Sequence, residues 1–164
     1  MGQIVLDFFR DQSVLGRDRL AYAAQPGIDV LDVTFFIMPV RLSLCGVELL
    51  EWPGVRSRPS SEWCPLPLLH VAAIGLDLVR SLEGETQKAT YSLPEVGTEL
   101  RLARMGDRVR VYSTMNGREA TVGYDELLSA FERFAQGVRR MLLESVPALR
   151  DDPHWGAWFT ADDA

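Results

Sequence analysis

Two cysteines and two histidines are the side chains of this chain best suited to metal binding or nucleophilic catalysis. They are Cys45, Cys64, His70 and His154. A zinc site needs such ligands at short, characteristic spacings, and only Cys64 and His70 lie close in sequence, at a spacing that fits no zinc pattern. We therefore expect no metal site, and we interpret Cys64 as a small buried hydrophobe and His70 as a partly buried helix residue.

Covalent catalysis by a cysteine or serine requires a base, which His70 or His154 would have to supply. The sequence around Cys64, SEWCPLP, matches no nucleophile motif. Carboxylate pairs such as Asp125 and Glu126 could serve acid–base chemistry, but a solvated helix end explains them better. The chain contains neither a glycine-rich nucleotide loop nor a Walker sequence. The sequence thus predicts no catalytic residue, no metal and no cofactor.

A polar sheet face is the first candidate for partner binding. Arg101, Arg110 and Tyr112 fall at alternating positions of two expected strands, among carboxylates. Arg and Tyr are enriched at the energetic hot spots of protein interfaces. The competing interpretation is an ordinary solvated face with cross-strand ion pairs.

The second candidate is the aromatic and acidic C-terminal segment. It contains Trp155 and Trp158, close to Asp151 and Asp152. These rings would either dock onto their own domain or bind a partner, which could be a second copy of the chain.

Composition and charge narrow the classes of protein. A chain of 164 residues with 47% apolar and 24% charged residues fits one folded, soluble domain spanning residues 1–164. The formal charge of −6 argues against a general nucleic-acid binder and favours basic partners. All basic residues except Lys88 are Arg, a bias that a GC-rich genome explains more simply than a phosphate-binding function.

No segment indicates a membrane or an export signal. The longest apolar run, 65–79, is too short to span a bilayer and contains His70 and Asp77. The N-terminus lacks the cationic start of a signal peptide, and two cysteines do not make a disulfide framework. We expect a cytoplasmic protein.

Hydrophobic periodicity predicts the elements of the first half. Alternation over 3–10 and β-branched residues over 30–45 predict strands, and Pro39 indicates an edge or a bulge in the second. Residues 17–24 could form a short helix. Gly46 permits a hairpin into a strand over 47–52, and the Pro- and Arg-rich residues 55–61 are a candidate contact loop.

The second half has a clearer pattern. Apolar spacings of three and four predict helices, and alternation predicts an antiparallel meander in which Asn116-Gly117 forms a type I′ turn. The expected helices are 65–82, 125–144 and a short one near Trp155, and the expected strands are 87–93, 98–104, 108–114 and 119–123. The predicted class is α+β: a curved, mostly antiparallel sheet of six or seven strands with two main helices on one face and a short C-terminal helix.

Four segments carry a resemblance to known proteins. The run LSLCGVELLEWPG, the helix start WCPLPLLHVAAIGLDLV, the meander and YDELLSAFERFAQGVRRMLLESVPAL resemble small uncharacterised actinobacterial domains, some of similar build being immunity partners of polymorphic toxins. The resemblance implies an antiparallel sheet with helices against it in a single cytosolic domain, and no catalytic residue to carry over.

These observations lead to one functional hypothesis and two alternatives. The leading one is a non-catalytic protein-binding domain, specifically an immunity protein that neutralises a basic toxin domain through its acidic surface. The first alternative is a small-molecule-binding or enzymatic domain with a pocket between sheet and helices, near Cys64, His70 and Tyr112. The second is a module that self-associates through its aromatic tail.

Overall fold

A computed structural model describes residues 3–25, 35–51, 63–84 and 87–158. The elements, in chain order, are β1 (Ile4–Phe8), α1 (Gln12–Ala24), β2 (Ile37–Leu44), β3 (Val47–Glu48), β4 (Cys64–Pro67), the π-helix η1 (His70–Gly75), α2 (Leu76–Ser81), β5 (Lys88–Leu93), the 3₁₀ turn η2 (Pro94–Val96), β6 (Thr98–Met105), β7 (Arg108–Ser113), β8 (Glu119–Gly123), α3 (Tyr124–Ser145), the 3₁₀ turn η3 (Pro147–Asp151) and α4 (Trp155–Trp158). The predicted strand residues 30–34 and the contact loop 55–61 lie outside the described residues.

The α+β class and the antiparallel pairing are confirmed, but the expected single sheet of six or seven strands is not. The described strands form two sheets of four, which we name sheet A (β1-β2-β3, with β4 also paired to β2) and sheet B (β5-β6-β7-β8). In the described chain, side chains rather than a backbone ladder join the two sheets. Asn116 Nδ2 donates to the backbone oxygens of Glu48 at 3.0 Å and Glu51 at 3.3 Å. The β layer therefore divides where β3 meets the β7–β8 hairpin.

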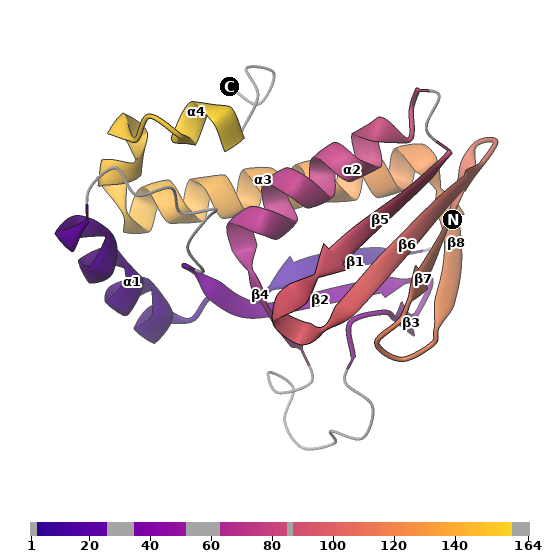
Figure 1. Ribbon diagram of the computed structural model, residues 1–164, viewed down its shortest axis with the longest axis horizontal. Helices are drawn as coiled ribbons and strands as arrows, with labels where there is room; N and C mark the ends of the chain where they lie inside the picture. The colour runs from indigo at the N-terminus through magenta and orange to yellow at the C-terminus, as the bar shows by residue number, and fades with distance from the viewer. Residues whose placement is uncertain (1–2, 26–34, 52–62, 85–86, 159–164) are drawn as a thin grey trace.

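The two main helices cover both sheets rather than one face of a single sheet. Helices α2 and α3 lie side by side, with sheet A below α3 and sheet B beside it (Figure 1). The predicted apolar stripe of α3 is confirmed, since Leu127, Phe131, Phe134, Val138 and Leu142 are each at most 5% exposed. One continuous hydrophobic core joins these side chains to both sheets.

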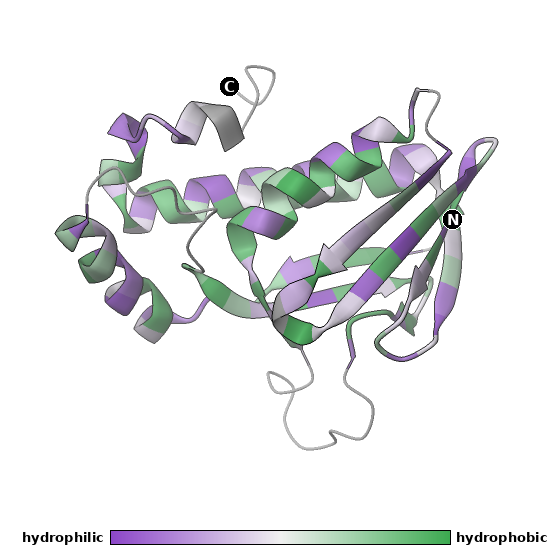
Figure 2. Ribbon diagram, viewed as in Figure 1, coloured by the Kyte–Doolittle hydropathy of each residue, from purple (hydrophilic) through white to green (hydrophobic). Residues whose placement is uncertain are grey.

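Sheet B has the two-faced pattern that its sequence predicts. Hydrophobic and hydrophilic residues alternate along β6 (Figure 2), with Leu100 and Leu102 buried and Arg101 exposed. Val109, Val111 and Val122 extend the buried face across β7 and β8.

The predicted helix 65–82 is wrong at its start. Residues Cys64–Pro67 form strand β4 instead, and the helix follows as η1 and α2. The amide of Leu68 donates to Phe36 O, so the backbone N–H and C=O groups of the even-numbered residues of β4 point toward β2. The backbone groups of Pro65 and Pro67 therefore point toward the opposite edge of β4, where no described strand pairs. A proline costs no ladder hydrogen bond there and blocks pairing with another strand. These two prolines therefore belong to an edge strand rather than to the first turn of a helix.

The two predicted hairpins are present, but the type I′ turn predicted for the β7–β8 hairpin occurs in the β2–β3 hairpin instead. Asn116 has an ordinary negative φ and Gly117 alone is left-handed, so the predicted type I′ turn is wrong although the β7–β8 hairpin is present. Between β2 and β3, Cys45 (φ 53°) and Gly46 (φ 81°) are both left-handed in a two-residue loop, the geometry of a type I′ turn. The Asn116 side chain instead donates to the backbone oxygens of Glu48 and Glu51 between the two sheets.

A buried polar network ties α1 to the C-terminal segment. The Tyr22 hydroxyl donates to the buried carboxylate of Asp152, whose other oxygen accepts from the His154 amide at 2.8 Å. Asp18, also buried, accepts from the Phe36 amide at 2.7 Å. Burial and the neighbouring Asp152 carboxylate raise the pKa of Tyr22 well above its ordinary value. These hydrogen bonds hold α1 against the segment before α4 and against the residue that precedes β2.

Candidate functional site

The outer face of sheet B is the surface on which Arg101, Arg110 and Tyr112 lie. Strand pairing aligns Thr90, Arg101, Tyr112 and Glu119 in one row across all four strands of the sheet. Arg110 lies in the adjacent row, opposite Ala103 and Thr121. The structure thus brings the three predicted sheet residues together on one solvent-facing surface, because their positions share the parity of the pleat.

This surface is only partly neutralised by its own carboxylates. Arg101 pairs with Glu99, two residues away on the same strand, at 3.0 Å. Within the described residues Arg110 makes no hydrogen bond or ion pair, and it is exposed. A shallow groove of about 400 Å³ runs along Thr90, Arg101, Arg110, Tyr112 and Glu119. The ladder of cross-strand ion pairs expected of an ordinary polar face is not formed here.

The C-terminal candidates are divided between interior and surface. Trp155 is 6% exposed and Asp152 is 7% exposed, and both contact the protein itself, whereas Asp151 is exposed. The Trp158 side chain lies outside the described part of the structure, although its backbone belongs to α4. Trp155 therefore docks onto its own domain, and the Asp152 carboxylate accepts from the His154 amide and the Tyr22 hydroxyl, so neither side chain is left for a partner surface.

Cys64, His70 and Tyr112 do not converge on a pocket. Cys64 is fully buried in β4, and Tyr112 points to the outer side of sheet B, away from the helices. The cavity between α2, α3 and sheet B has about 10 Å³, at the lower limit of what one water molecule needs, and is lined by apolar residues such as Leu78, Leu100 and Phe131. In the described ranges no three His, Cys, Asp or Glu side chains cluster as metal ligands do.

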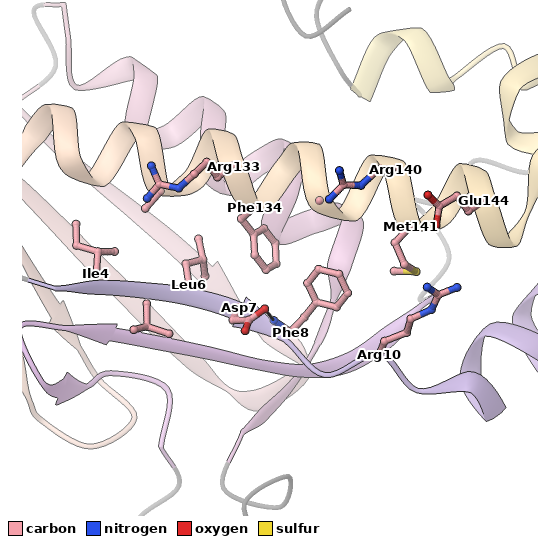
Figure 3. Close-up of a pocket in the computed structure, with 13 residues that line it drawn as sticks. Ile4, Leu6, Asp7, Phe8, Arg10, Arg133, Phe134, Arg140, Met141 and Glu144 are labelled. Atoms are coloured by element: carbon pink, nitrogen blue, oxygen red, sulfur yellow. Dashed lines mark hydrogen bonds between the residues drawn. The ribbon is translucent and has the colours of Figure 1, made fainter.

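Sequence reasoning missed a second open site, a groove of about 660 Å³ between β1 and α3 (Figure 3). Leu6, Phe8 and Phe134 form its apolar floor, and the rings of Phe8 and Phe134 meet edge to face with centroids 5.7 Å apart. Arg133 and Arg140 line it from α3. The available signal was the spacing of Arg133, Gly137 and Arg140, which at steps of four and three form one stripe of a helix.

Comparison with protein-family models, with curated proteins and with solved structures finds no significant match for this chain. Among the residues that the structure describes, no helix combines the length and the apolar character needed to cross a bilayer.

Proposed function

We propose that this chain is a non-catalytic protein-binding domain whose contact surface is the outer face of sheet B. The observation that carries the proposal is the row of Arg101 and Tyr112 on the four-stranded meander, beside the exposed Arg110, which has no ion-pair partner among the described residues. A planar guanidinium with free donors binds a carboxylate with two hydrogen bonds, and a half-buried tyrosine adds contact area at little entropic cost.

The charge of this face defines the contact more closely than the charge of the whole chain. Its cations are Lys88, Arg101, Arg108 and Arg110, and its carboxylates are Glu99 and Glu119. A face with an excess of cations complements carboxylates on the partner, while the chain's net charge of −6 steers a partner of positive net charge at long range. The cytoplasmic partner that we propose is a basic toxin domain, and binding would block its toxic activity, as an immunity protein does.

Matched variants of exposed residues test the proposal in the native host. Arg110→Glu reverses the free cation, and Tyr112→Thr removes the ring while keeping a good strand former. Arg19→Glu, on the exposed side of α1, makes the same charge change away from the face. Each form is tagged and purified from the host, and the recovered proteins are identified.

We expect the wild type and Arg19→Glu to retain one stoichiometric partner. Arg110→Glu and Tyr112→Thr should weaken its binding by about 30-fold, as interface hot spots of about 2 kcal/mol do. For the immunity role, co-expression should restore growth to cells that produce the partner. Recovery of no stable partner by the wild type, together with no protection against a toxin encoded next to it, would contradict the proposal.

A further inference from the structure

The groove between β1 and α3 contains an unpaired strand edge. Strand β1 ends sheet A and pairs only with β2 among the described strands. Cys45 N donates to Gln3 O, and Phe9 N donates to Pro39 O, so the odd-numbered residues of β1 face β2. The backbone groups of Ile4, Leu6 and Phe8 therefore point outward.

Few of these outward groups have partners. The Phe8 amide is taken by the carboxylate of Asp7 at 2.8 Å. In the described structure, the N–H groups of Ile4 and Leu6 have no acceptor, and this edge carries no proline like those that protect β4. A strand edge with free donors and acceptors is a template for an added strand.

The helix wall of the groove has room and charge for such a strand. Gly137 lies on this wall in the middle of α3, and a Cβ built there has no atom within 4 Å outside its chain neighbours and the backbone of its own helix. A glycine inside a helix destabilises it by roughly 1 kcal/mol, and internal packing does not require this one. Gly137 leaves open space on the helix wall of the groove that β1 also lines.

Arg133 and Arg140 flank that glycine, about 10 Å apart along two turns of α3. Both are exposed, and neither makes a hydrogen bond or ion pair with a described residue. Arg10 closes one end of the groove, where it donates to Ser145 Oγ at 3.1 Å. The carboxylates in the groove are Asp7, which already accepts from a backbone amide, and Glu144.

From these observations we infer that the groove binds an extended acidic peptide segment of a partner protein, which adds as a strand to β1 beneath α3. The outward groups of Ile4 and Leu6 would pair with the peptide backbone, and Arg133 and Arg140 would bind carboxylates two to four residues apart in it. A second copy of the chain joined through β1 would bring two arginine-lined walls together, so charge favours the acidic peptide. This inference does not depend on the outer face of sheet B, which lies on other strands.

Two labelled synthetic peptides test the inference by fluorescence anisotropy. One alternates Glu with Val and Thr, and the other has Lys in place of every Glu. We expect saturable binding of the Glu peptide and at least tenfold weaker binding of the Lys peptide at low salt. Arg133→Glu with Arg140→Glu should reverse that preference, and Arg110→Glu on sheet B should leave it unchanged.

Two further measurements separate strand addition from simple charge attraction. Hydrogen exchange of the Ile4 and Leu6 amides should slow on addition of the Glu peptide, because those groups gain acceptors. Gly137→Leu should abolish saturable binding by filling the groove, and Gly16→Leu, at a similarly open glycine of α1, should not. Thermal unfolding of each variant checks that it is folded.

Equal binding of the two peptides, or an unchanged preference in the doubly reversed protein, would overturn the inference. It would also be overturned if the edge amides exchanged at the same rate with and without peptide. A concentration-dependent dimer that Gly137→Leu abolishes would assign the groove to a second copy instead.

Discussion

The Tyr22–Asp152 hydrogen bond joins α1 to the segment before α4, and its contribution to the free energy of unfolding can be measured. Tyr22→Phe removes the hydroxyl that donates to the buried Asp152 carboxylate. Among the described residues, that carboxylate then keeps one donor, the His154 amide. Hydrogen bonds to charged groups contribute about 1.5–3 kcal/mol, so we expect the free energy of unfolding to fall by about 2 kcal/mol. In a domain of this size that lowers Tm by roughly 4–8 °C.

Tyr124→Phe is the matched control. The Tyr124 hydroxyl is also buried but has no hydrogen-bond partner among the described residues. Its ring, which Arg104 covers at 4.0 Å, is kept in Tyr124→Phe. Removing an unsatisfied buried hydroxyl should be neutral or slightly stabilising. Urea unfolding followed by circular dichroism gives both values, and a double-mutant cycle with Asp152→Ala isolates the pair. Equal costs for the two Tyr→Phe changes would refute the reasoning.

The same bond predicts an alkaline limit to stability. The pKa of Tyr22 is raised in the folded state, chiefly by burial, so its contribution is complete below the ordinary tyrosine value near 10 and is lost as the pH rises above it. The wild type should therefore lose stability more steeply than Tyr22→Phe between about pH 10 and 12. Parallel slopes of the two unfolding curves in that window would contradict this assignment.

Substitutions at three further positions have defined outcomes. Asp11 caps α1 by accepting from the Ser13 hydroxyl and from the Ser13 and Val14 amides, which lower its pKa, so its stabilisation is present above about pH 4 and is lost below. Asp11→Ala should reduce helical circular dichroism at pH 7, whereas Asp11→Asn should keep the cap and remove the acid dependence. Gly75→Ala places a Cβ 2.9 Å from the Phe131 ring and should cost about 1–3 kcal/mol in urea unfolding; no loss would mean that the ring moves freely. Cys45→Asn, at φ 53°, should raise the free energy of unfolding by about 0.5–1 kcal/mol, since Asn tolerates the left-handed conformation that this turn requires; a loss would mean that the cysteine side chain contributes to the turn.

Periodicity was a reliable guide wherever one face of an element is buried by the rest of the chain. The meander and the stripe of α3 were predictable because alternation and i, i+3, i+4 spacing report burial directly. Pro65 was misread because a proline is equally at home in a first helical turn and on a free strand edge. The recurrence of proline at Pro67, two residues on, fits a strand better.

Features that depend on contacts between distant segments were out of reach of the sequence. At the division between the two sheets, Asn116 contacts the backbone of Glu48 and Glu51, which lie far from it in the sequence. Asp152 reads as a helix cap in isolation, and its burial beneath Tyr22 requires the whole fold. The residues of the outer face of sheet B were predictable because the alternation of a pleated strand is local. That Arg110 makes no ion pair with a described residue was not predictable from the sequence.

Hydroxyl-radical footprinting of the complex isolated from the native host tests the central claim most directly. We expect oxidation of Tyr112 to fall several-fold on binding, while Leu20, which is 68% exposed on α1, keeps its rate. An unchanged rate at Tyr112 in a stoichiometric complex would show that the partner binds elsewhere and that the outer face of sheet B is ordinary solvated surface.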